Sequence, residues 1–509
     1  MNWSDREMKL LWGDLHNHCG ITYGFGDLEN ALSVAKEQLD FCAIIGHAMW
    51  PDMPERTEGL EFLVDFHLKG FAKLRGNWEH VRETVKTWNV PHEFVTFQGY
   101  EIHSSEFGDH HVLTTSDELP LIEAGSPSEL VAALAPLPVI AVPHHVSYTP
   151  GYRGANWEAF SESISPVVEV YSKHGCSMSD SSAYPCWHTM GPRDSRNTVV
   201  SAIRSGRKFG FAGSTDHHAG YPGSYGDGRV AVLATEKTRD AIWEALLARR
   251  TYAITGDKIA CSFTVNGAIF GSEVKVDGRR ELKLDVTGCD FIDKVSVYKN
   301  GVLWKVVNAQ YAGLQQLPEP QTQGKYKVRV EMGWGDSQTG YVWQGSARLD
   351  KGQIVSVETC FRGQSVLAPT PEMRDNPDIN LLGNKLIAWS EQTAEWTCTT
   401  FKNVSTRHPQ TAALIFEIEG DTNSQLSIEV NGQTFTYTIG ELLEGSRSAH
   451  MLPHSSEAIL VHRAVPEHAY CFQGEWHDDE KERDCDAYHV EIRQTNEQYA
   501  WITPVFVIS

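Results

Sequence analysis

The stretch KLLWGDLHNH, residues 9–18, decides the fold. Residues 9–15 form an apolar, strand-like run that leads directly into His16 and His18. Side chains alternate along an extended chain, so both imidazoles point to the same side of this segment. Because neutral imidazole is the commonest metal ligand in proteins, the pattern predicts a strand that ends at a metal site. Two solvated surface histidines are the alternative interpretation.

Six more strand-like runs occur before residue 216, and nearly all of them carry His, Asp or Glu at one end. They span residues 40–45, 93–99, 111–114, 137–142, 166–171 and 208–213. Helix-like stretches separate several of them, over residues 28–38, 126–134 and 198–205. Strands alternating with helices predict an α/β fold with a parallel sheet, open or closed into a barrel. In such barrels functional residues gather at the carboxyl ends of the strands, and seven runs suggest a barrel one unit short of the eightfold form.

Further metal ligands are predicted at these strand ends. The last run leads into STDHH, residues 214–218, where Asp216 and His218 repeat the spacing of the first pair. The second run closes at His47, and Glu101 follows the third. Metal ions held close together need a bridging carboxylate, and Glu101 is the best-placed one between the second and fifth runs. The alternative for Glu101 is a solvated surface glutamate, and the alternative for the STDHH segment is a loop of stacked surface residues.

Two adjacent histidine pairs leave a choice open, because only one of two neighbours in a strand can point into the site. In the pair at 110–111 we favour His111, and in the pair at 144–145 we favour His144. With this choice His110 and His145 face the substrate or support the ligands. In the alternative choice they are themselves the ligands. Asp27 precedes a predicted helix, so it is either a metal ligand or a helix N-cap.

Other residues near the strand ends have supporting roles. Glu169 lies in a buried-looking strand, PVVEVY, where it is expected to orient a histidine ligand. His174 and His145 are candidates for protonating a leaving group. Arg153 and Lys173 follow ligand-bearing strands and are candidates for binding an anionic substrate, although loop cations are more often only solvated.

Composition and charge narrow the function further. A chain of 509 residues exceeds the ~250–300 at which one hydrophobic core stops growing, so at least two domains are expected. The net charge of −22 disfavours nucleic acid and anionic membranes as partners. No apolar run reaches the ~18 residues of a membrane span, and the N-terminus lacks a secretory signal, which favours a cytoplasmic protein. The ten Cys include no C-x-x-C pair, and nucleophile-elbow, P-loop and dinucleotide-binding motifs are missing.

From about residue 260 the pattern changes to short alternating strands. Asn-Gly pairs at 266–267, 300–301 and 431–432 lie between or beside such strands and predict hairpins. We expect a barrel domain over 1–259, a β-sandwich domain over 260–364, and a second β-rich region over 365–509 that completes or extends the sandwich. Residues 365–385 are expected to form a loop or linker. No chemistry is predicted in this half, which could shape the mouth of the barrel or make an oligomer interface.

The ordered set of motifs carries a family resemblance. GDLHNH, GH at 46–47, GYE at 99–101, PHH at 143–145, VEVYS at 168–172 and STDHH together resemble the PHP (polymerase and histidinol phosphatase) superfamily. The resemblance covers residues 10–260 and implies a distorted (β/α)7 barrel with up to three metal ions. Residues 245–259 and 488–507 are similar to a PHP subgroup with C-terminal, Ig-like β-structure.

The resemblance also implies how the ligands are shared. One ion is expected on His16, His18, Glu101 and Asp216; a second on Glu101, His111 and His144; and a third on Asp27, His47 and His218. The chain departs from the family pattern at Gly46, where an Asp is usual, at Met178, where an acid is common in the subgroup, and in its longer Asp27 loop.

The expected chemistry is hydrolysis. Two or three zinc, manganese or iron ions would activate a water as hydroxide near pH 7 and stabilise the charge that develops on the substrate. Family precedent favours a phosphoester of a small, anionic molecule. One alternative is hydrolysis of an amide, an ester or another C–N or C–O bond on the same centre. The other is a non-catalytic, metal-stabilised module that binds a glycan or a partner.

Overall fold

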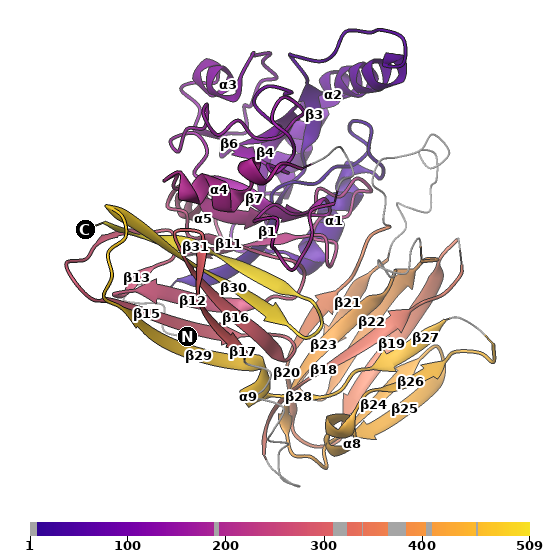
Figure 1. Ribbon diagram of the computed structural model, residues 1–509. Coiled ribbons are helices and arrows are strands. Elements are labelled where there is room, and N and C mark those ends of the chain that lie inside the picture. The colour runs from indigo at the N-terminus through magenta and orange to yellow at the C-terminus, as the bar shows by residue number, and fades with distance from the viewer. Residues whose placement is uncertain are drawn as a thin grey trace.

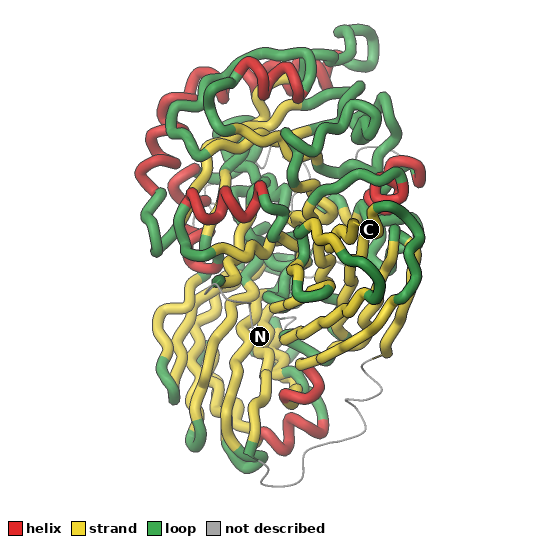
Figure 2. The backbone as a smooth tube through the Cα atoms, turned by 90° about the vertical axis from the view of Figure 1, so that its left-hand side faces the viewer, coloured by secondary structure: helices red, strands yellow, loops and turns green. Residues whose placement is uncertain are grey.

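The computed structural model describes residues 8–187, 193–308, 323–337, 339–364, 383–403, 410–454 and 457–508. The chain up to about residue 254 is mixed α/β, and the remainder is built mainly from antiparallel strands (Figure 1). In Figure 2 most helices flank the strands of the N-terminal part, while the other end of the molecule is nearly all strand.

The strands of the N-terminal part agree closely with the predicted runs. They are β1 (Lys9–Asp14), β2 (Phe41–Ala43), β3 (Gly46–Met49), β4 (Val95–Ile102), β5 (His110–Thr114), β6 (Val139–Pro143), β7 (Val167–Ser172), β8 (Gly175–Cys176), β9 (Gly210–Gly213), β10 (Arg229–Ala234) and β11 (Thr251–Ile254). The helices are α1 (Leu28–Gln38), α2 (Glu61–Trp88), α3 (Pro127–Ala133), α4 (Val199–Arg204) and α5 (Arg239–Leu247), with a 3-10 turn η1 (Ser195–Asn197).

These strands do not close into the expected barrel. The hydrogen-bonded path of the largest sheet is open and runs β17-β16-β30-β31-β11-β10-β1-β2-β4-β5-β6, while β7, β8 and β9 form a separate sheet. The pairing is also mixed: β1, β2 and β4 are parallel, but β5 is antiparallel to both β4 and β6. The mixed α/β class is therefore observed, whereas a closed (β/α)7 barrel is not confirmed.

Helix α2 is the longest helix, and it covers β3 and β4. Its buried side chains recur every three or four residues and include Val64, Phe71, Leu74, Trp78 and Val81, the spacing of an amphipathic helix. Leu74, Trp78 and Val81 form one core together with Leu28, Leu32 and Ala35 of α1. Among the described residues, no helix has both the length and the apolar character needed to cross a membrane.

Among its described residues, the C-terminal half consists of strands with two short helices. Its elements are β12 (Ala260–Val265), β13 (Ala268–Ile269), β14 (Glu273–Lys275), β15 (Arg280–Thr287), β16 (Ile292–Lys299), β17 (Val302–Asn308), β18 (Gly324–Gly333), β19 (Tyr341–Leu349), β20 (Gln353–Cys360), β21 (Lys385–Trp389), β22 (Thr393–Thr400), β23 (Ala412–Gly420), β24 (Gln425–Val430), β25 (Gln433–Thr438), α8 (Ile439–Glu444), β26 (Arg447–His450), β27 (Ala458–Val461), β28 (Val465–Pro466), α9 (Glu467–Tyr470), β29 (Cys471–Asp478), β30 (Cys485–Gln494) and β31 (Tyr499–Ile508).

The three predicted Asn-Gly hairpins are confirmed. They join β12 to β13, β16 to β17 and β24 to β25. Both residues of each pair have positive φ, for example +48° and +80° at Asn266 and Gly267. This backbone is the one that a two-residue turn needs to match the twist of its strands, and Asn and Gly adopt it most readily.

The expected domain boundaries at 260–364 and 365–509 stay predictions. Strand β31 pairs with β11 of the N-terminal part, and β30 pairs with both β31 and β16 (Figure 1). Strands β18 to β27 form two other sheets, which share a core that includes Trp343, Trp396 and Phe416. An Ig-like topology is not confirmed. The linker expected over 365–385 lies mostly outside the described residues.

Candidate metal centre

His16 and His18, which follow β1, direct two ring nitrogens at each other. His16 Nδ1 lies 3.0 Å from Glu169 Oε2, and His18 Nδ1 lies 2.6 Å from the carbonyl oxygen of Ile45. A carbonyl only accepts, so the proton of neutral His18 is on Nδ1 and Nε2 carries a lone pair. Neutral His16 donates to Glu169 in the same way. The two Nε2 atoms are nevertheless 3.1 Å apart, an arrangement that a cation between them would stabilise.

Glu101, at the end of β4, occupies the bridging position. Its Oε2 lies 3.4 Å from Nε2 of both His16 and His18 and 3.2 Å from Nε2 of His47. Its Oε1 lies 3.2 Å from His144 Nε2. One carboxylate thus faces four histidines from three segments, which is the geometry expected of a ligand shared between ions.

Asp216 brings a second carboxylate from the loop after β9. Its Oδ1 is 3.1 Å from His18 Nε2, and its Oδ2 is 2.8 Å from His174 Nε2. The residue has φ +49°, in the left-handed region that few residues other than glycine adopt. Such backbone conformations cluster at functional sites, where the surrounding structure holds them in place.

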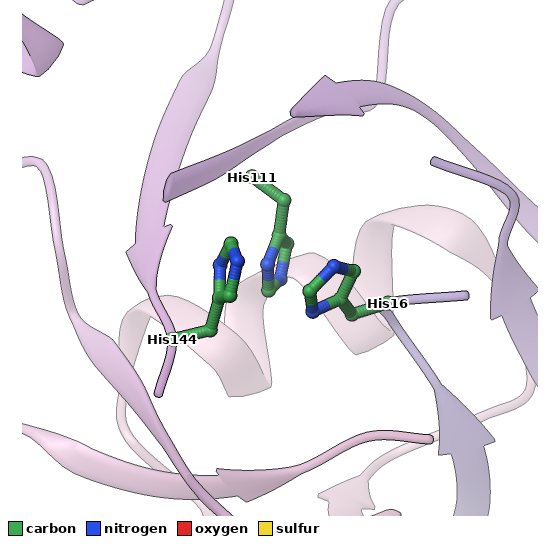
Figure 3. A group of neighbouring side chains, drawn as sticks. All are labelled: His16, His111 and His144. Atoms are coloured by element: carbon green, nitrogen blue, oxygen red, sulfur yellow. The ribbon is translucent and has the colours of Figure 1, made fainter. Parts of the chain in front are cut away.

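His111 and His144 complete a second group with His16. The three rings converge from separate segments (Figure 3), with His16 4.7 Å from His111 and 4.2 Å from His144 between ring centroids. Both nitrogens of His111 are buried, and neither has a hydrogen-bond partner among the described residues. His110 behaves differently, because its Nδ1 lies 2.8 Å from the carbonyl oxygen of Gly108. The geometry therefore favours His111 over His110 as the ligand.

His47 and His218 join His18 in a third group, whose ligand atoms all lie within 4.8 Å of one another. Asp27 does not accompany them into the interior. Its side chain is exposed at the N-cap position of α1. The preceding residues 20–26 fold back on themselves, and the Gly20 N–H donates a hydrogen bond to the Gly26 carbonyl oxygen. Asp27 has the N-cap position of α1, but its side chain makes no capping hydrogen bond, and its role as a ligand stays a prediction.

Packing requires a small residue before His47. A Cβ atom at Gly46 would lie 2.6 Å from Leu74 Cδ1 of α2 and 3.2 Å from Thr22 Cγ2. A larger side chain would therefore push α2 away from β3.

The charges of the cluster do not balance. Burial holds the pKa of His47, His111 and His144 well below the ordinary value, so these imidazoles are neutral at pH 7. Burial alone would raise the pKa of Glu101 and Asp216, but neighbouring histidines keep both well below the usual range. The pKa of His16 is lowered by burial but raised more strongly by Asp216 and Glu169. Two buried carboxylates thus face one imidazolium, and divalent cations would supply the missing positive charge.

Asp14 joins the segment of His16 and His18 to the segment of Asp216 and His218. Its buried carboxylate accepts hydrogen bonds from the backbone N–H of His16 and of Thr215 and from the Thr215 hydroxyl. The backbone of Asp216 donates to the carbonyl of His16, 2.7 Å away. Burial raises the pKa of Asp14 to about 6, although these hydrogen bonds oppose the rise. The loops after β1 and β9 are therefore fixed to each other.

Sequence reasoning missed a second buried group beside the cluster. His103 Nδ1 lies 3.2 Å from Glu101 Oε1 and 3.0 Å from Asp109 Oδ2, and its Nε2 lies 3.2 Å from the Tyr23 hydroxyl. Asp109 is fully buried and also pairs with Arg153. His103 follows Glu101 by two residues, so the alternation of side chains in a strand could have indicated that both face the site.

The remaining predicted residues lie around the cluster. His145 Nε2 is 3.3 Å from Asp109 Oδ2, and Lys173 Nζ is 3.2 Å from His218 Nδ1. Arg153 stacks over Trp50 beside His103. Glu169 has the expected position against His16. The structure thus gathers all the predicted residues except Asp27, and their roles as ligands, acids or substrate contacts remain predictions.

Comparisons with known proteins give distant relatives. No family model matches the chain. An uncharacterized protein of Chlamydia pneumoniae is 26% identical over 44% of this chain and 40% of its own length. Another, from Chlamydia trachomatis, is 25% identical over 53% of this chain and 43% of its own length. The chain spans less than half of the length of these relatives.

One solved structure is similar over much of the chain's length. It comes from Bacteroides vulgatus and is described as a two-domain protein containing a predicted PHP-like metal-dependent phosphoesterase. The match covers 85% of this chain and 96% of that one, with 13% identity and a TM-score of 0.31. A TM-score this low transfers neither fold nor activity, so we base the function on the geometry of the cluster.

Proposed function

We propose that this protein is a metal-dependent hydrolase that cleaves a phosphoester of a small molecule. The observation that supports it most is the approach of the Nε2 atoms of His16 and His18, which lie 3.1 Å apart between the carboxylates Glu101 and Asp216. Nitrogen and carboxylate ligands in this mixture suit catalytic zinc, manganese or iron, whereas structural zinc sites saturate with Cys and His around one ion.

The ligand sets that we propose follow the observed groups. One ion would be held by His16, His18, Glu101 and Asp216, and a second by Glu101, His111 and His144. His47 and His218 would contribute to a third ion without Asp27. When bound, such ions supply a water nucleophile near neutral pH and stabilise negative charge on a phosphoryl group.

The protein's own residues would orient these ligands and handle the leaving group. Glu169 fixes the His16 ring by accepting from Nδ1, and His174 holds Asp216 from the opposite side. His145 or His174 would give a proton to the departing oxygen. Arg153 and Lys173 would attract an anionic substrate, because both lie at the edge of the cluster.

Hydrolysis of nitrophenyl esters by metal-loaded protein tests the proposal. Protein stripped of metal and reloaded with zinc, manganese or iron should release nitrophenol from p-nitrophenyl phosphate. Glu101→Gln should abolish this release while the protein stays folded. Release from p-nitrophenyl acetate but not from the phosphate would move the assignment to carboxylic esters and amides. Folded, fully loaded protein that cleaves neither would favour a non-catalytic role.

A further inference from the structure

A polar pocket of about 430 Å³ lies between the N-terminal part and the sheets formed by β18 to β27. Lys173, Tyr184 and Tyr225 line it from the N-terminal part, and Arg362 and Gln410 line it from the C-terminal half. The volume is that of a small-molecule site, and domain interfaces are common places for such sites. Both halves of the chain therefore contribute side chains to this pocket.

The pocket adjoins the metal centre. Lys173, one of its lining residues, lies 3.2 Å from His218 Nδ1. Gly363 packs against the neighbouring His217 so closely that a Cβ atom there would lie 2.7 Å from His217 Cε1. The wall from the C-terminal half is thus in contact with the motif that carries Asp216 and His218. A substrate held at the metals would extend into this pocket.

Arg362 is the residue that gives the pocket its selectivity. Its guanidinium stacks on Tyr225, 4.7 Å from the ring centroid, and donates from Nη1 to the Tyr225 carbonyl, 2.7 Å away. Arg329, on the other hand, also stacks on Tyr225 but is neutralised by Asp257 at 2.5 Å. Within the described part of the chain, Arg362 forms no ion pair, and its buried Nε has no hydrogen-bond partner.

The rest of the lining suits a hydroxylated molecule. Aromatic rings of Tyr184 and Trp187 lie among the side-chain amides of Asn496 and Gln498. Rings offer flat apolar surfaces against which a hydroxylated chain or ring can pack, and the Gln498 side-chain nitrogen offers a donor. The Asn496 amide is already bonded to Asp257, and Gln498 Oε1 accepts from Thr255. Three acids also line the pocket: Glu331 is paired with His462 at 2.7 Å, Asp227 lies 3.9 Å from His217 Nε2, and Glu497 is exposed.

We propose that this pocket holds the body of a polyhydroxylated substrate and that Arg362 binds a second acid group of that substrate. This inference rests on the proposed phosphoesterase function, since the first acid group is the phosphate held at the metals. The second group is a carboxylate or another phosphate, because a guanidinium fork recognises both. The C-terminal half thus determines which phosphoester is accepted.

Three open-chain compounds that differ only at C1 test the assignment: glucitol 6-phosphate, gluconate 6-phosphate and glucitol 1,6-bisphosphate. Calorimetric Kd values are measured on zinc-loaded protein, and kcat/KM is compared for any compound that is hydrolysed. A charge-assisted hydrogen bond to a buried guanidinium corresponds to a preference of roughly 10–100-fold. Preference for the gluconate assigns a carboxylate, and preference for the bisphosphate assigns a phosphate.

Two variants and one control separate recognition from folding. Arg362→Ala should remove the preference for the second acid group, and Arg362→Gln, which keeps a donor for the Tyr225 carbonyl, should remove it too. Arg348→Ala removes an exposed arginine of β19 and should leave the preference unchanged. Equal Kd values for the three compounds, binding of none of them, or a preference that survives in folded Arg362→Gln would overturn the inference. Binding with the expected preference but without hydrolysis would support the pocket and contradict the phosphoesterase.

Discussion

The Nε2 atoms of His16 and His18 lie 3.1 Å apart, although each ring already forms a hydrogen bond through Nδ1. In the neutral state both atoms are acceptors, so they repel each other unless a positive charge lies near both. Glu101 and Asp216 add carboxylate oxygens within 3.4 Å of His18 Nε2. A proton on His16 or a bound cation would relieve this repulsion, and the predictions below test the bound cation.

Removal of metal should destabilise the protein without unfolding it. Without cations the buried carboxylates lose their compensating charge, whereas the apolar cores around Leu74 and Trp343 are unaffected. Chelator treatment should lower the thermal midpoint by several degrees and leave the far-UV circular dichroism spectrum unchanged, and zinc should restore the midpoint. Complete unfolding on chelation would instead indicate a structural site.

His111 and His110 form a matched pair for testing the ligand set. His111→Ala should remove about one metal equivalent per chain, because both of its nitrogens are buried beside His16 and His144. His110→Ala should retain the full metal content, since His110 bonds the Gly108 carbonyl instead. Elemental analysis of the two purified variants gives the answer, and equal losses would contradict the assignment.

Glu169→Gln should weaken metal binding without abolishing it. Glu169 touches the ring of His16 rather than a metal position, and loss of such an orienting carboxylate typically costs roughly 10–100-fold in metal affinity. Competition with a fluorescent zinc chelator measures the affinity. Full occupancy should return at high zinc, whereas a variant that never regains the missing ion would show that Glu169 is itself a ligand.

The ion pair of Glu331 with His462 should make stability depend on pH. Burial would raise the pKa of Glu331, but His462 lowers it to about 2 from 4.5. A lowered folded-state pKa stabilises the protein above pH 4.5, and this contribution is lost as the pH falls towards 2. On metal-free protein, the difference in thermal midpoint between wild type and Glu331→Gln should be largest above pH 5 and shrink towards pH 3. A difference that stays constant would contradict the account.

Local features of the fold could be predicted because short-range physics determines them. Helix α1 begins and ends at the predicted residues 28 and 38, since its apolar spacing and flanking residues are local signals. The Asn-Gly turns are equally local. Helix α2 was missed although Val64, Phe71, Leu74 and Trp78 have helical spacing, because the many charged residues between them obscure the pattern.

Long-range features could not be predicted in this way. Nothing in the sequence of β31 indicates that it pairs with β11 rather than with a strand close to it in the chain. The pattern of His, Asp and Glu at strand ends nevertheless indicated most of the residues that the structure brings together. Asp109 escaped notice because no turn or repeated spacing marks it, and His103 was overlooked although it follows Glu101 at the spacing of His16 and His18. Asp27 lies at the surface, which the sequence could not indicate because the fold of residues 20–26 is irregular.

The metal content of the protein, purified without chelator or nickel affinity resin, tests the central claim most directly. Mass-spectrometric elemental analysis should find two or three equivalents of zinc, manganese or iron per chain, and Asp216→Asn should lower that number. Folded protein that contains one equivalent or none, and that takes up no added metal, would contradict the metal-dependent hydrolase.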